Sequence, residues 1–237
     1  FAGGGTPKKQ VVIIDGPPGS GKSVLAAKIW AHLVTDNRLP DGSVVFTATS
    51  ASQSSNWSYL FRQAAHDVAA SGVVKKAASY TPISTQTLGR LRKKYGESFL
   101  ADAMKWRENI STLRALGNEF QDGGRDEQYL VSIVDEAHAL INPEEPEGRG
   151  QYGFAPTLGP QAYHIIRSST VSIFLLDAQQ SFRDRENTTV TDIKKWAVEL
   201  GAQVRGEISL AGAQFRCAGS KEYVEWVEAV LRGEPAE

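Results

Sequence analysis

The sequence predicts an α/β fold, a doubly wound parallel sheet flanked by helices, within one domain that covers residues 1–237. Apolar runs of strand length alternate with segments of helical spacing, and three of these runs end in aspartate. The runs are apolar on both faces, as strands of parallel sheets are. Hydrophobic residues make up 41% of the chain, which is enough for a sizeable core. We therefore expect ligands at the carboxyl ends of the strands.

The amino-terminal part contains two predicted strand and helix pairs. Residues 10–15 (QVVIID) and 43–48 (SVVFTA) are uninterrupted apolar runs rich in β-branched residues, which indicates buried strands. Helical spacing follows each of them, first from Gly21 and then from Asn56. The apolar face expected on the second helix is formed by Trp57, Leu60, Phe61 and Ala64.

The rest of the chain continues the alternation of strands and helices. Further strands are expected at 80–84, 129–135 and 171–177. Further helices are expected at 88–95, 98–116 and 220–232. Residues 142–160 are rich in proline, glycine and glutamate, so we expect a mobile surface loop there.

A glycine-rich motif lies between the first strand and the first helix. Residues 16–23 read GPPGSGKS, which matches the phosphate-binding pattern G-x-x-x-x-G-K-[ST] in the strand-to-helix context that this pattern requires. Its amides and the helix N-terminus would surround the phosphates of ATP, Lys22 would reach the β- and γ-phosphates, and Ser23 would bind Mg²⁺. The predicted nucleotide-binding residues are Gly16, Pro17, Pro18, Gly19, Ser20, Gly21, Lys22, Ser23 and Val24.

Two acidic residues stand where the strand at 129–135 runs out. Asp135 is expected to hold Mg²⁺ through water, and Glu136 is expected to orient and polarise the attacking water. This is the Walker B position of a P-loop NTPase. The two residues, together with Lys22, predict an ATPase.

Three further segments allow a comparison with a known family. Residues 135–138 (DEAH) resemble helicase motif II, residues 176–180 (LDAQQ) resemble motif III of superfamily 1, and residues 210–217 (LAGAQFRC) resemble motif IV. Leu176 replaces the glycine that is usual before the motif III aspartate. The resemblance implies that Gln180 senses the γ-phosphate, that Arg216 contacts it, and that His138 couples motif II to Gln180. VDEAHAL, IIRSSTVSIFLLDAQQ and QFRCAGSKEYVEWV together are similar to the Schlafen-like DNA/RNA helicase domains.

The same resemblance implies a RecA-like domain that contacts single-stranded DNA or RNA. Residues 46–50 occupy the place of motif Ia and residues 83–88 that of motif Ib. Hydroxyl groups at strand ends and nearby basic side chains suit phosphate contacts. The expected nucleic-acid contacts are Thr47, Thr49, Ser50, Thr85, Thr87, Arg90, Arg92 and Lys93.

Net charge, apolar runs and cysteine content limit the functions and the cellular location that can be expected. The net charge of −1 does not indicate a nucleic-acid binder by itself, so that role depends on local patches. No apolar run is long enough for a membrane helix, and the one cysteine, Cys217, fits a reducing compartment, so we expect a cytoplasmic protein. Because the chain begins with Phe1 and ends in a short tail, we expect a fragment whose second RecA-like domain lies beyond it.

Two other functions remain open. The same nucleotide site could drive an ATPase switch or signalling module, for example in phage defence, without unwinding anything. A small-molecule kinase also uses a P-loop, but it would need a lid with arginines and an acceptor pocket, and neither is recognisable in the sequence.

Overall fold

Six parallel strands form a single sheet in the computed structural model, which describes residues 8–64, 72–77, 93–94, 96, 106–107, 126–142, 159–180 and 188–210. The strands are β1 (Gln10–Asp15), β2 (Val44–Ala48), β3 (Gly72–Lys76), β4 (Tyr129–Val134), β5 (Ser169–Leu176) and β6 (Gln203–Ser209). Their order across the sheet is β3-β2-β4-β5-β1-β6, and every pairing is parallel. The predicted α/β class is confirmed, in a form compatible with a RecA-like P-loop domain.

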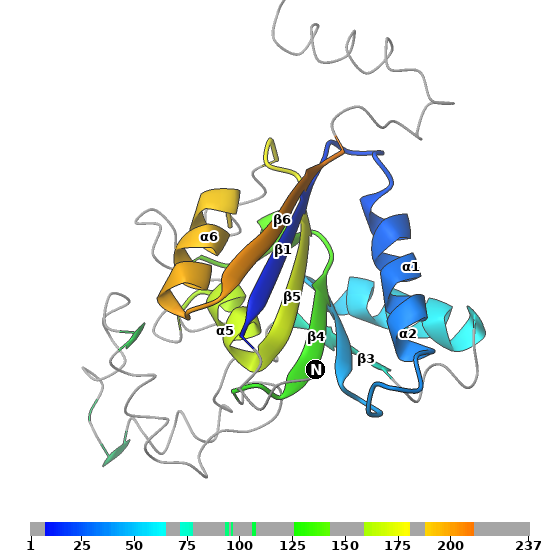
Figure 1. The fold of residues 1–237 in the computed structure, drawn as a ribbon, viewed down its shortest axis with the longest axis horizontal. Helices are drawn as coiled ribbons and strands as arrows, with labels where there is room; N and C mark the ends of the chain where they lie inside the picture. Colours follow the sequence, from blue (N-terminus) through cyan, green and yellow to red (C-terminus); the bar gives the residue numbers. More distant parts are fainter. Residues whose placement is uncertain are drawn as a thin grey trace, which may run out of the picture.

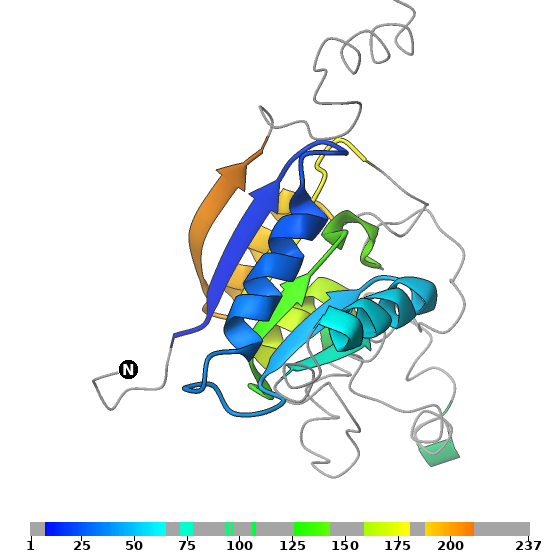
Figure 2. The same ribbon diagram turned by 90° about the vertical axis from the view of Figure 1, so that its right-hand side faces the viewer.

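Helices cover both faces of this sheet. They are α1 (Lys22–Val34), α2 (Ala51–Ala64), α5 (Gln161–Ser168) and α6 (Val190–Glu199), with a short 3₁₀ helix, η5 (Ala137–Ala139), after β4. Helices α1 and α2 lie on one side of the sheet and α5 and α6 on the other (Figure 1). Figure 2 views the molecule from the side of α1 and α2, with the sheet behind them. The arrangement is doubly wound, as predicted.

Alternation along the strands divides the core into two layers. In β1, Ile13 packs into the layer beneath α5 and α6, while Ile14 packs into the layer beneath α1 and α2. Trp30 of α1 stacks on Phe61 of α2 with ring centroids 3.9 Å apart, and Trp196 of α6 is fully buried in the opposite layer. Strands that bury both faces explain the uninterrupted apolar runs of the sequence.

Helix α2 begins at Ala51, ahead of the expected start at Asn56. The cause is a capping arrangement, in which the Gln53 amide donates to Ser50 Oγ at 3.2 Å and the Ser50 amide donates to Gln53 Oε1 at 3.3 Å. This S-x-x-Q pattern is a recognised helix start. The expected apolar face was also partly wrong, because Leu60 is exposed.

Several elements were not expected from the sequence, namely β3, α5, α6 and β6. Strand β6 is an edge strand with mostly exposed residues (QVRGEIS), so it lacks the apolar run that identifies its neighbours. Strand β5 begins at Ser169 instead of residue 171. The expected elements at 80–84 and 220–232, and most of those at 88–95 and 98–116, lie outside the described residues.

The expected loop at 142–160 also lies largely outside the described residues, but its two ends are placed. The Gln161 amide donates to Ile141 O at 3.1 Å, and the Ile141 amide donates to Gln161 Oε1 at 2.9 Å. These two bonds hold the ends of the loop together. Within the described residues, no helix combines the length and the apolar character needed to cross a membrane.

Candidate functional site

The Gly16–Ser23 loop joins β1 to α1 at the carboxyl edge of the sheet. Gly19 and Gly21 have φ angles of 85° and 87°, in the left-handed region that favours glycine. A Cβ atom on Gly16 would lie 2.7 Å from Ser20 Oγ and 2.8 Å from the Cβ atom of Leu210. The loop therefore requires glycine at these positions, and it leads directly into the N-terminus of α1, the positive end of the helix dipole.

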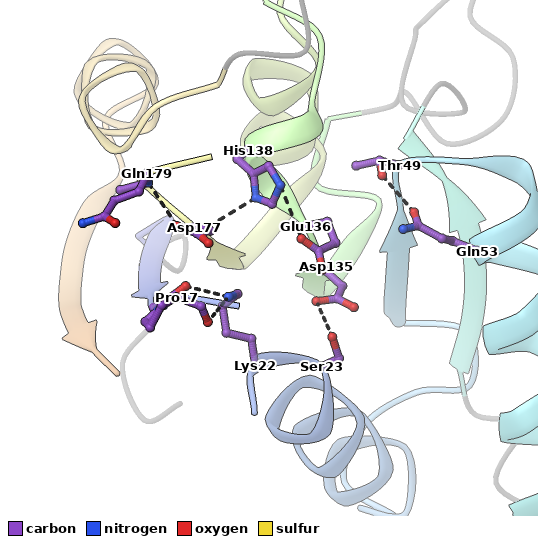
Figure 3. Close-up of polar contacts among 12 residues, drawn as sticks. Pro17, Lys22, Ser23, Thr49, Gln53, Asp135, Glu136, His138, Asp177 and Gln179 are labelled. Carbon is purple, nitrogen blue, oxygen red and sulfur yellow. Dashed lines mark hydrogen bonds and ion pairs between the residues drawn. The ribbon is translucent and has the colours of Figure 1, made fainter. Parts of the chain in front are cut away.

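Lys22 is buried inside this loop. Its ammonium donates to Gly16 O at 2.6 Å and to Pro17 O at 3.0 Å, as Figure 3 shows. An ammonium group carries three N–H donors, so these bonds use two of them. The two bonds hold the positive charge within the loop, where it can act on an anion that the loop binds.

Ser23 and Asp135 face each other across the site. The Ser23 hydroxyl donates to Asp135 Oδ1 at 3.4 Å (Figure 3), and the Asp135 amide donates to Thr47 O of β2 at 3.1 Å. Burial raises the pKa of Asp135 to about 6, with a further contribution from Glu136 and an opposing one from the Ser23 hydroxyl. A nearby cation would favour the charged carboxylate and oppose this shift.

These two oxygen atoms fit a magnesium ion. Mg²⁺ prefers hard oxygen ligands and is typically held by one or two protein groups, completed by water and phosphate oxygens. Among the residues that the structure describes, no group of three or more His, Cys, Asp or Glu side chains is placed to hold a metal. The Ser23 hydroxyl and the Asp135 carboxylate could hold such an ion together with water and phosphate oxygens.

Glu136 lies in an unusual backbone conformation. Its φ of 54° and ψ of 45° are left-handed, which is uncommon for a residue other than glycine. Such strain often occurs at functional sites. The turn directs the carboxylate to a position where Glu136 Oε2 lies 3.4 Å from His138 Nε2, and the side chain keeps 35% of its surface exposed. Glu136 is thus accessible to a water molecule.

His138 connects this turn to the end of β5. Its Nδ1 accepts a hydrogen bond from the Asp177 amide at 3.2 Å, and its Nε2 faces Glu136 (Figure 3). Burial lowers the pKa of His138, while Glu136 and Asp177 oppose that shift. A neutral ring that accepts at Nδ1 carries its proton on Nε2, directed at the Glu136 carboxylate. The ring therefore links the Glu136 turn to the turn that follows β5.

The Asp177–Gln180 turn follows β5, which lies between β1 and β4. The Gln179 amide donates to Asp177 Oδ1 at 3.0 Å, and the Gln180 amide donates to Asp177 O at 3.2 Å. Asp177 is buried and Gln180 is exposed. His138 thus contacts the turn that carries Gln180 at the amide of Asp177, and the expected coupling of His138 to Gln180 stays a prediction. The part played by the Asp177 amide was not recognisable from the sequence, because this bond joins η5 to the turn after β5 and the two segments are far apart in the chain.

The expected nucleic-acid contacts are placed only in part. Thr47 is fully buried within β2, so its side chain does not reach the surface and is removed from that set. Thr49 Oγ1 donates to Gln53 Oε1 at 2.9 Å (Figure 3), and both Thr49 and Ser50 are partly exposed. Lys93 is exposed. Four of the expected contacts lie outside the described residues, namely Thr85, Thr87, Arg90 and Arg92. The motif IV candidate, Arg216, also lies outside them.

One comparison with known proteins gives a match. The family model described as "Schlafen group 3, DNA/RNA helicase domain" matches residues 9–237. No curated protein and no solved structure matches the chain. The family match spans nearly the whole chain and confirms the resemblance found in the motifs.

Proposed function

The chain belongs to the Schlafen group 3 DNA/RNA helicase domain family, and we propose that it is the ATP-binding and ATP-hydrolysing motor domain of a superfamily 1 type helicase or translocase. The observation that carries this proposal is the approach of the Ser23 hydroxyl to Asp135 beside the buried Lys22 ammonium. These groups come from residues far apart in sequence. Together they offer a cation site and a phosphate site at one edge of the sheet.

Each residue has a chemical role in this proposal. Lys22 neutralises charge on the transferred phosphoryl group from its position in the loop. Ser23 and Asp135 would supply protein oxygens to hold Mg²⁺, and the ion would offset negative charge on the phosphates. Glu136 orients the attacking water with its partly exposed carboxylate, and Gln180 senses the γ-phosphate. The reaction class is phosphoryl transfer to water.

Arg216 is proposed as a further contact to the γ-phosphate. The Leu210 amide donates to Asp15 O at 2.7 Å, and Leu210 lies against Gly16. The chain therefore leaves β6 beside the entrance of the Gly16–Ser23 loop. Because each extended residue spans at most about 3.3–3.6 Å, the segment from Leu210 to Arg216 can reach across about 20 Å. Arg216 is within reach of the phosphates on this account.

We propose that single-stranded nucleic acid binds at the surface next to the end of β2 and at the basic segment near Lys93. Charge reversal at Arg92 and Lys93 should weaken strand binding and reduce the dependence of log K on log salt by about 0.7 for each phosphate that the variant no longer neutralises. Fluorescence anisotropy with a labelled single strand, over a series of salt concentrations, measures this slope. The matched control is Lys28→Glu, which changes an exposed lysine on α1. Equal slopes for all three proteins would show that the strand runs elsewhere.

An ATPase switch that does not act on nucleic acid is the alternative function. Steady-state ATPase activity of the full-length protein, with and without single-stranded DNA or RNA, separates the two. The motor predicts hydrolysis that depends on Mg²⁺, ceases in excess chelator and increases when strand is added. Hydrolysis that is stimulated by neither single-stranded DNA nor single-stranded RNA would favour the switch. An absence of Mg²⁺-dependent hydrolysis under every condition would contradict both.

A further inference from the structure

Asp15 is the last residue of β1 and stands immediately before the Gly16–Ser23 loop. Its strand lies between β5 and β6, and backbone hydrogen bonds fix the strand end on both sides. The Gly16 amide donates to Leu176 O of β5 at 3.2 Å, and the Leu210 amide donates to Asp15 O at 2.7 Å. The backbone at Asp15 is thus held in place independently of its side chain.

The side chain of Asp15 makes a third connection. Its Oδ1 accepts a hydrogen bond from the Ala178 amide at 2.8 Å. Ala178 belongs to the Asp177–Gln180 turn, so the bond joins the strand that leads into the loop to the turn that carries Gln180. Neither residue has a role in the proposed hydrolysis site described above.

Each backbone amide of this turn donates a hydrogen bond. Those of Gln179 and Gln180 bind within the turn, to the side chain and the carbonyl of Asp177. The other two bind side chains from outside, because the Asp177 amide donates to His138 and the Ala178 amide donates to Asp15. The Asp15 bond is the shortest of the four. The turn is therefore tied at one point to the Glu136 side of the site and at another to the phosphate loop.

We propose that Asp15 is a positioning residue, whose carboxyl group holds the Ala178 amide and thereby places Gln180 in register with phosphates bound by the Gly16–Ser23 loop. This inference rests on the proposed function, because Gln180 matters only if phosphate is bound and hydrolysed there. Asp15 itself does not touch the reacting atoms. Its role is to transmit the position of the loop to the turn, since a displacement of about 1 Å at a reacting group can cost as much as about 100-fold in rate.

Removing the acceptor should slow hydrolysis without preventing nucleotide binding. We expect Asp15→Ala to lower kcat by about 10- to 100-fold, with little change in the Kd of a fluorescent ATP analogue. Asp15→Asn should recover most of kcat, because its amide oxygen can still accept from the Ala178 amide. In a Gln180→Ala background, Asp15→Ala should produce little further loss, because its effect passes through Gln180. A purely structural role would instead lower thermal stability and act equally in both backgrounds.

Hydrogen exchange of the turn amides provides a readout that does not depend on hydrolysis. Exchange at Ala178 should be faster in Asp15→Ala than in the wild type and should slow again in Asp15→Asn. If Asp15→Ala does not fold, Asp15→Glu tests the same point, because the added methylene moves the carboxyl group and should lower kcat while binding persists.

The possible results separate the two proposals. If the wild type is active and Asp15→Ala has the same kcat, the role of Asp15 alone is overturned. The same holds if Asp15→Ala lowers kcat by an equal factor in the Gln180→Ala background. A wild type without ATPase activity would overturn the proposed function and this inference with it.

Discussion

Glutamine in place of Glu136 should lower kcat for ATP hydrolysis by about 10²–10⁴-fold while leaving the affinity for Mg²⁺-ATP nearly unchanged. The amide has almost the shape of the carboxylate but lacks its negative charge, so it cannot polarise the attacking water in the same way. Glu136 has a partly exposed carboxylate and is not part of the Ser23 and Asp135 pair that would hold the cation. Steady-state turnover at saturating ATP, together with titration of a fluorescent analogue, measures both quantities.

The chain offers a closely matched control for this substitution. Glu127 lies just before β4 and Glu136 lies just after it, and both residues have a φ of 54°. Glu127→Gln therefore makes the same chemical change in the same backbone region at the opposite end of the strand, and it should leave kcat unchanged. If Glu136→Gln instead abolished nucleotide binding, Glu136 would be a structural residue and the assignment of the water-positioning role would fail.

The residues whose positions could be predicted from the sequence are those in which motif spacing or strand topology determines the local geometry. The GPPGSGKS motif follows an apolar strand and opens a helix, and these local features alone predict the loop between β1 and α1. Asp135 could be predicted to lie beside Ser23 because carboxyl ends of parallel strands meet at one edge of the sheet. The contact at 3.4 Å joins residues more than a hundred positions apart, and only the parallel topology makes it foreseeable.

Most of the features that could not be predicted depend on contacts between segments that are far apart in the sequence. The bond from the Ala178 amide to Asp15 and that from the Asp177 amide to His138 leave no periodic trace in the sequence. Strand β6 was missed because an exposed edge strand need not be apolar. Thr47 was expected at the surface because a threonine near a strand end gives the same sequence pattern whether its side chain faces solvent or the core, and in the structure it is fully buried.

Alanine in place of Lys22 should lower kcat/KM for ATP by at least about 10²–10³-fold, the cost of removing one preorganised donor from a transition-state charge. The loss should exceed that of a surface charge, because Lys22 is buried and its ammonium is fixed on Gly16 O and Pro17 O. The nucleotide affinity should fall as well, which distinguishes this variant from Glu136→Gln. Turnover and analogue binding, measured on the same preparations, give both numbers.

Two comparisons keep this result interpretable. Lys28→Ala removes an exposed lysine from the same helix and should leave binding and turnover intact, which excludes a general effect of charge. Lys22→Arg retains the positive charge but presents a planar, larger group in a buried position between two carbonyls, so it should also lose activity. A thermal unfolding midpoint close to that of the wild type would show that the loop variants remain folded. Unchanged turnover in a folded Lys22→Ala protein would mean that hydrolysis does not occur at this loop, and the proposed site would then be wrong.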